Sequence, residues 1–205
     1  MSKLIIIDNT LGAGKTTLIN KLIVRNPSWY KIPECVSLSE DPIFQVTDKY
    51  FTDYTQSKIV SKISEAIGHP VIISDRIFSA PKYWAIYGNL EITEYTNLLI
   101  QRIKELLKNT KIYYIYLNDP TPDKSILLTN IKSRNRDFEQ HYTSEKLIEL
   151  ENIYQRSISD LDGLDYNSYV INLTKDFYDS GYLWIEGIVR QGGDQMDNGH
   201  ITDTN

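Results

Sequence analysis

The chain has 205 residues, 41% of them hydrophobic, which is enough to bury the core of one domain. Its net charge of -5 gives no broad basic surface, so binding to nucleic acid is not expected, and no apolar run approaches the roughly 20 residues that a membrane helix needs. The one cysteine, Cys35, cannot form an internal disulfide and no charged-then-apolar leader opens the chain, so we expect a cytoplasmic protein.

Short β-rich apolar runs alternate with longer segments of helical period along the chain. The predicted strands cover residues 3–8, 29–33, 70–74, 111–117 and 169–173, and the predicted helices cover 15–25, 47–67, 92–107, 122–131, 143–161 and 181–190. This alternation is typical of a parallel sheet with helices on both faces. We therefore predict one α/β domain with a five-stranded parallel sheet over residues 1–191, followed by a disordered polar tail over 192–205.

A phosphate-binding loop (P-loop) is predicted where the first strand turns into the first helix. Glycines in this turn allow successive N–H groups, together with the start of the new helix, to face phosphate oxygens. Lys15 would reach the β and γ phosphates, Thr16 would bind Mg²⁺, and Thr17 would contact the α-phosphate region. The predicted nucleotide-binding residues are Asn9, Gly12, Ala13, Gly14, Lys15, Thr16 and Thr17. The alternative is a glycine-bearing turn that binds nothing.

Three charged residues follow predicted strands at the edge of the sheet where open α/β folds bind ligands. Glu34 comes after the second strand and is our candidate base for an acceptor hydroxyl. Asp75 and Arg76 come after the third strand, where the acid can hold Mg²⁺ and the arginine can steady the acceptor or the transferring group. The alternatives are a solvated carboxylate at Glu34 and an ordinary surface pair at Asp75 and Arg76.

Residues 132–140 lie between two predicted helices and predict a mobile lid. Arg134 and Arg136 can wrap phosphate oxygens, close over the nucleotide and exclude water. An ordinary charged connection between helices would have the same composition. In the second predicted helix, Tyr54 and Gln56 can line a nucleoside pocket by stacking or by amide pairing with a base.

These separated pieces, in this order, resemble the deoxynucleoside kinases, especially the bacterial and viral enzymes for deoxyadenosine, deoxyguanosine and deoxycytidine. The likeness covers about residues 3–175. The loop over residues 9–17 is similar to the family's phosphate loop. Glu34-Cys35 stands where the family has Glu-Pro, and Asp75-Arg76-Ile77 stands where it has Asp-Arg-Ser. Residues 134–140 reproduce the family's lid pattern, Arg-x-Arg-x-x-Glu-Gln. Two departures are Asn9, where the full P-loop pattern has glycine, and Asn130, where the first lid arginine often stands.

The resemblance implies a P-loop NTPase fold with a lid, and transfer of the ATP γ-phosphoryl group to the 5'-hydroxyl of a deoxynucleoside with Mg²⁺. It implies that Glu34 accepts the proton of that hydroxyl, that Arg76 assists near the same oxygen, and that Asp75 holds the Mg²⁺ shell.

For the lid, the resemblance implies that Arg134 and Arg136 clamp the donor phosphates and that Glu139 reaches the sugar 3'-hydroxyl. It also implies a homodimer. The preference for a base cannot be read from the sequence.

Thymidylate kinases are the closest alternative, because they share a similar loop and an Asp-Arg pair. Glu34 favours a nucleoside acceptor, since a hydroxyl must lose a proton, and no arginine lies between Arg25 and Arg76 to hold an acceptor phosphate. A viral kinase for a hydroxymethylated base in DNA is a third candidate. A nucleotide-binding switch without phosphoryl transfer is a candidate from another class.

Overall fold

The structure is a computed structural model that describes residues 2–9, 12–32, 50–87, 89–134, 141–174 and 177–191. Its strands are β1 (Ser2–Asp8), β2 (Tyr30–Lys31), β3 (Val71–Asp75), β4 (Thr110–Asn118) and β5 (Tyr166–Asn172). Its helices are α1 (Lys15–Arg25), α2 (Phe51–Ala66), α3 (Ser79–Tyr87), α4 (Glu94–Leu107), α5 (Ser125–Ser133), α6 (Ser144–Ser157), the 3-10 helix η2 (Ile158–Leu161) and α7 (Phe177–Gln191).

All five strands form one parallel sheet in the order β2-β3-β1-β4-β5, which confirms the predicted α/β class. The central strand β1 pairs with β3 on one side and β4 on the other, so that Ile5 lies opposite both Ile73 and Tyr113. The side chains from Leu4 to Ile7 are fully buried. A strand covered on both faces needs a continuous apolar run, and this is the run that the sequence has.

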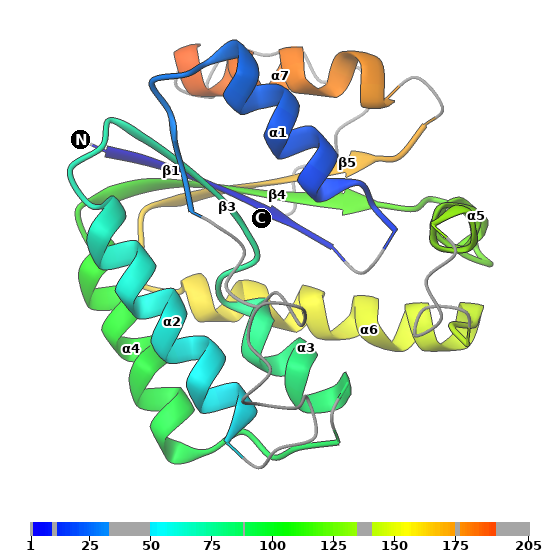
Figure 1. Ribbon diagram of the computed structural model, residues 1–205, viewed down its shortest axis with the longest axis horizontal. Helices are drawn as coiled ribbons and strands as arrows, with labels where there is room; N and C mark the ends of the chain where they lie inside the picture. The colour runs from blue at the N-terminus through cyan, green and yellow to red at the C-terminus, as the bar shows by residue number, and fades with distance from the viewer. Residues whose placement is uncertain are drawn as a thin grey trace.

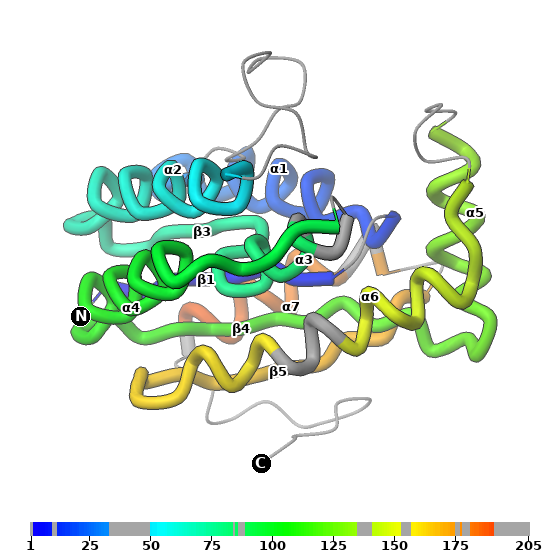
Figure 2. Tube along the Cα trace, turned by 90° about the horizontal axis from the view of Figure 1, so that it is seen from below, coloured from blue at the N-terminus to red at the C-terminus, as the bar shows by residue number. Residues whose placement is uncertain are grey.

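Helices cover both faces of the sheet (Figure 1). The pair α1 and α7 lies on one face, and α2, α3, α4 and α6 lie on the other, as the view turned by 90° also shows (Figure 2). Helix α5 covers neither face and lies beyond the carboxyl end of β4. This end of the sheet is where ligands of open α/β folds bind, so α5 borders the expected site.

Several elements differ from the sequence prediction, among them α3, α5, β5 and α7, which begins at Phe177 and not at residue 181. Helix α3 was not predicted, because it is only nine residues long and contains Pro81. Proline is tolerated in the first helical turn, where backbone N–H groups have no partner within the helix. Strand β5 begins at Tyr166, three residues before the predicted strand, because its parallel pairing with β4 extends back to Ile112.

None of the helices in the described ranges is long and apolar enough to cross a membrane.

Candidate phosphate-binding and acceptor site

Two glycines just before α1 have the backbone conformation that a P-loop requires there. Gly12 has φ 83° and Gly14 has φ 71°, in the left-handed region that residues with a side chain rarely adopt. Gly14 is also the N-cap of α1, and its carbonyl accepts a hydrogen bond of 3.0 Å from the Leu18 N–H. The two predicted glycines therefore make the turn.

Lys15 and Arg76 converge on one backbone carbonyl. Lys15 Nζ donates to the Asn9 carbonyl oxygen at 3.1 Å, and Arg76 Nε donates to the same oxygen at 3.2 Å. Asp75 Oδ1 lies 4.0 Å from Lys15 Nζ and 3.9 Å from Arg76 Nε. The ends of two neighbouring strands, β1 and β3, thus bring together three of the residues singled out in the sequence.

The Lys15 ammonium is almost fully buried, with 6% of the side chain exposed. Burial lowers the pKa of Lys15 from 10.5 to about 8, and the nearby Arg76 charge acts in the same direction. Asp75 and Asp8 oppose this shift, while the positive charge of Arg134 adds to it. Arg134 follows α5 directly, so its guanidinium acts on the P-loop from the side of that helix. A site with this excess of positive charge favours an anionic ligand.

Asp8, which the sequence analysis did not select, is a buried carboxylate at the base of the P-loop. It accepts hydrogen bonds from Ser79 Oγ at 2.6 Å and Tyr114 OH at 2.7 Å, and from the Asn9 N–H at 2.9 Å. The pKa of Asp8 is raised overall, because the effect of burial exceeds the lowering by these two hydroxyls and by the charges of Arg76 and Lys15. Asp8 therefore joins the P-loop to the start of α3 and to β4. An acidic residue directly after four apolar strand residues, Leu4 to Ile7, was the available signal.

Arg76 is fixed from two sides. Its backbone has φ 47°, and its N–H donates to the Ile7 carbonyl at 3.2 Å. Its guanidinium carbon lies 4.5 Å from the ring centroid of Tyr83 in α3, a cation–π contact. The short helix α3 thus supports the arginine that precedes it.

Thr16 and Asp75, the predicted Mg²⁺ ligands, fit that ion. Asp75 Oδ1 is buried and accepts no hydrogen bond within the described part of the chain, and Thr16 is exposed in the first turn of α1. The described residues contain no group of three or more His, Cys, Asp or Glu that could hold a metal. Mg²⁺ at phosphate sites usually takes only one or two protein oxygens and completes its shell with phosphates and water.

Helix α5 contacts the P-loop directly. Asn130 Nδ2 donates to the Gly12 carbonyl oxygen at 2.9 Å. Arg134 caps the carboxyl end of this helix. The other predicted lid residues, Arg136 and Glu139, and the candidate base Glu34 lie outside the described residues, so the lid and the base stay predictions.

The second predicted helix contains an unusual buried amide. Gln56 in α2 is 0% exposed, and neither its Oε1 nor its Nε2 has a hydrogen-bond partner among the residues that the structure describes. Thr52 Oγ1, one helical turn earlier, is also buried and has no hydrogen-bond partner among the described residues. Tyr54 is half-buried, and Lys58 Nζ lies 4.7 Å from the centroid of its ring. Buried polar groups normally have partners, so this turn of α2 is suited to a polar ligand.

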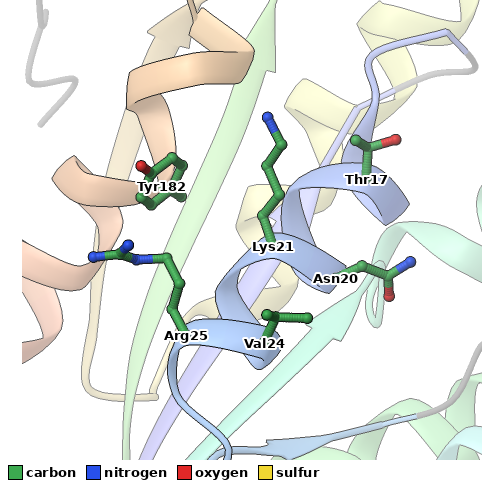
Figure 3. A pocket seen from close by; sticks show the side chains of 6 residues that line it. All are labelled: Thr17, Asn20, Lys21, Val24, Arg25 and Tyr182. Atoms are coloured by element: carbon green, nitrogen blue, oxygen red, sulfur yellow. The ribbon is translucent and has the colours of Figure 1, made fainter.

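A groove of about 600 Å³ lies between α1 and α7 and runs along α1 from Thr17 to Arg25 (Figure 3). It is lined by Thr17, Asn20, Lys21, Val24, Arg25 and Tyr182. The Arg25 guanidinium lies 4.8 Å from the ring centroid of Tyr182 and donates to Glu186 Oε1 at 2.9 Å. Among the lining residues, Thr17 alone belongs to the predicted nucleotide site, so the groove meets that site only at its end.

Comparison with known proteins supports the fold. No family model and no curated protein matches the chain. The YorR protein of Bacillus subtilis, solved in complex with phosphorylated GDP, is 16% identical, with a TM-score of 0.61 over 95% of this chain and 100% of that one. A deoxyadenosine kinase from M. mycoides, solved with the products dCMP and a flexible dCDP, is 18% identical, with a TM-score of 0.60 over 92% and 99%. The chain therefore has an α/β fold of the P-loop NTPase type.

Proposed function

We propose that the chain is an ATP- and Mg²⁺-dependent deoxynucleoside kinase of nucleotide salvage, which transfers the γ-phosphoryl group to the 5'-hydroxyl of a deoxynucleoside. The observation that carries this proposal is the convergence of Lys15, Asp75 and Arg76 beside the glycine turn that opens α1. The likeness of fold to a deoxyadenosine kinase supports a nucleoside or nucleotide kinase activity.

The P-loop would hold the donor phosphates. Backbone N–H groups around Gly12 and Gly14 and the amino end of α1 would bind phosphate oxygens, while Lys15 pairs with the β and γ phosphates. Thr16 and Asp75 would hold Mg²⁺, which neutralises phosphate charge as the transfer proceeds. Thr17 would contact the α-phosphate, and the lid arginines Arg134 and Arg136 would close over the donor.

The acceptor would enter from the side of β3 and α3. Arg76, held over Tyr83, would stabilise charge on the transferring group. Glu34 would take the proton of the 5'-hydroxyl as the oxygen attacks the γ-phosphorus, and ADP would leave with the electron pair of the broken bond. Glu139 would bind the sugar 3'-hydroxyl from the lid.

Gln56 would bind the base of the acceptor. An amide presents one acceptor and one donor side by side, which matches the edge of a nucleobase. Its two buried atoms lack partners within the described residues, and this support is independent of the P-loop. Leaving such groups unpaired costs about 1–3 kcal/mol each, and a base would recover that cost. Tyr54 would flank the same pocket. The homodimer is proposed from the family resemblance alone.

The test is product formation from γ-labelled ATP and Mg²⁺ with each deoxynucleoside, each deoxynucleoside monophosphate and a control without acceptor. We expect label in a deoxynucleoside 5'-monophosphate, which also names the preferred base. Label only in thymidine diphosphate would make the chain a thymidylate kinase. ATP binding without any acceptor-dependent product would favour a nucleotide-binding switch.

The role of Glu34 has its own test within this assay. We expect Glu34→Gln to lower turnover by ~100-fold or more with a modest change in ATP affinity, because loss of a general base affects the transfer step. Glu91→Gln, an exposed carboxylate before α4, is the control and should retain full turnover. Unchanged turnover of Glu34→Gln would rule out this residue as the base.

A further inference from the structure

Helix α5 lies so close to the P-loop that the two share backbone contacts. A Cβ atom added to Gly12 would lie 2.7 Å from the Leu127 carbonyl oxygen and 3.0 Å from Ile131 Cγ1. A hydrogen bond of 2.9 Å from Asn130 Nδ2 to the Gly12 carbonyl oxygen also joins them. Asn130 is also the residue that departs from the lid pattern, and the proposed function assigns it no role.

We propose that Asn130 is a positioning residue for phosphate binding, which fixes the orientation of the peptide between Gly12 and Ala13. The inference rests on the part of the proposed function that concerns nucleotide binding, and not on the identity of the acceptor.

The argument begins with the geometry of a trans peptide, in which the carbonyl and the following N–H point in opposite directions. Asn130 holds the Gly12 carbonyl toward α5. The N–H of Ala13, on the opposite side of the same peptide plane, is therefore directed away from α5. A P-loop binds anions by turning such N–H groups inward, so the hydrogen bond selects the orientation that binds phosphate.

A hydrogen bond to this peptide matters because glycine adopts either hand of backbone conformation at little cost. Gly12 and Gly14 flank Ala13, and both have positive φ. A chain segment with a glycine on each side can rotate its peptides through several orientations. The hydrogen bond from Asn130 removes this freedom before the ligand arrives, which lowers the entropy cost of binding.

The helix that carries Asn130 is itself firmly placed. Asp119, at the end of β4, accepts hydrogen bonds from the Thr121 N–H and the Leu127 N–H, both at 2.9 Å. Lys124, just before α5, pairs with Glu151 Oε2 of α6 at 2.6 Å and donates to the Asp119 carbonyl at 2.9 Å. These contacts fix α5 against β4 and α6, so the amide of Asn130 approaches the P-loop from a fixed support.

The experiment compares Asn130→Leu, which has a similar shape but no donor, with Asn130→Gln, which keeps the amide. Affinities for MgATP, for inorganic tripolyphosphate and for the deoxynucleoside found in the transfer assay are measured by calorimetry. Thr129→Ala, an exposed neighbour in α5, is the matched control. Thermal unfolding checks each variant, and Asn130→Ser replaces the leucine variant if that protein does not fold.

We expect Asn130→Leu to weaken MgATP and tripolyphosphate equally, by about fivefold to tenfold, as expected for one lost hydrogen bond. The deoxynucleoside affinity should not change, and Asn130→Gln should restore most of the phosphate affinity. Unchanged tripolyphosphate affinity in the leucine variant, or an equal loss for the deoxynucleoside, would overturn the inference. MgATP and tripolyphosphate are each titrated without acceptor, so these two affinities test the inference even if phosphoryl transfer fails.

Discussion

Lys15 combines a positive charge with nearly complete burial in the P-loop. Its pKa of about 8, against 10.5 for an exposed lysine, means that the charge is costly until an anion arrives. Bound phosphates would supply the missing negative charge and raise the pKa of Lys15 again. Nucleotide binding and protonation of this one side chain are therefore linked.

We predict that ATP affinity falls as the pH rises above about 8, because an increasing fraction of the empty protein must then take up a proton on binding. Below the pKa the ammonium is already protonated, so affinity near pH 7 should be insensitive to pH. Above it, the loss approaches a factor of ten per pH unit. Calorimetry at pH 9 in two buffers of different ionisation enthalpy would measure the proton uptake.

The control for this pH dependence is Lys15→Arg, which keeps a charge that does not titrate in this range. Its binding should be weaker than that of the native protein but flat with pH. A native affinity that stays constant between pH 8 and pH 10 would contradict the prediction.

Arg76 adopts a backbone conformation that favours glycine, with φ 47°. We predict that Arg76→Gly is more stable than Arg76→Ala by about 1 kcal/mol, because glycine alone relieves the left-handed strain. Both variants should lose at least about 100-fold in turnover, since each lacks the guanidinium that stabilises transferred charge. Urea denaturation measures the stability of the two variants, and the transfer assay measures their turnover.

A matched position tests whether the difference in stability between the glycine and alanine variants at Arg76 reports backbone strain. Lys108, exposed after α4, has φ -55°. There the glycine variant should be the less stable of the two, because it has more conformational freedom to lose on folding. The same order at both positions would mean that Arg76 is not strained.

At the scale of elements, a buried ion pair joins α6 to the β4–α5 connection. The Lys124 and Glu151 side chains are 10% and 13% exposed, and Tyr116 OH also donates to Glu151 Oε1 at 3.1 Å. Burial beside this carboxylate raises the pKa of Tyr116, which keeps the phenol a hydrogen-bond donor. Removing the charge of Glu151 would leave Lys124 buried without its counter-charge.

We predict that Glu151→Gln lowers the free energy of unfolding by about 3 kcal/mol. The control is Glu149→Gln on the same helix, whose ion pair with Lys146 is 40% to 56% exposed, and which should change stability by less than about 0.5 kcal/mol. Denaturant unfolding followed by circular dichroism measures both. Equal effects of the two substitutions would show that the buried pair contributes no more than the surface one.

The elements that could be predicted from sequence are those whose signal is local. β1 and the glycine turn could be predicted from adjacent residues alone. The parallel α/β class follows from the alternation of strand-like and helix-like hydrophobic periods along the chain. Helix α3 could not be predicted, because its nine residues are stabilised by contacts of the completed fold, such as Tyr83 beneath Arg76. Short helices depend on tertiary packing more than on propensity.

The same distinction applies to the site across the whole molecule. The positions of Lys15, Asp75 and Arg76 could be predicted from the local sequence, because Lys15 follows the glycine turn and the other two follow an apolar strand. The hydrogen bonds of Asp8 were not, because Ser79 and Tyr114 lie 71 and 106 residues further along the chain. Asn130 was visible only as a departure from a pattern, and its contact with Gly12 spans 118 residues.

The position of β1 between β3 and β4 has a consequence for how the chain is made. The ribosome delivers β1 well before β4, yet the pairing of the two strands requires residues as late as Thr110–Asn118. At roughly 5–20 residues per second, this apolar strand waits on the order of 10 s for its second neighbour. The P-loop therefore reaches its final shape long after it is synthesised, and the nascent chain must keep this apolar strand from pairing with other strands until then.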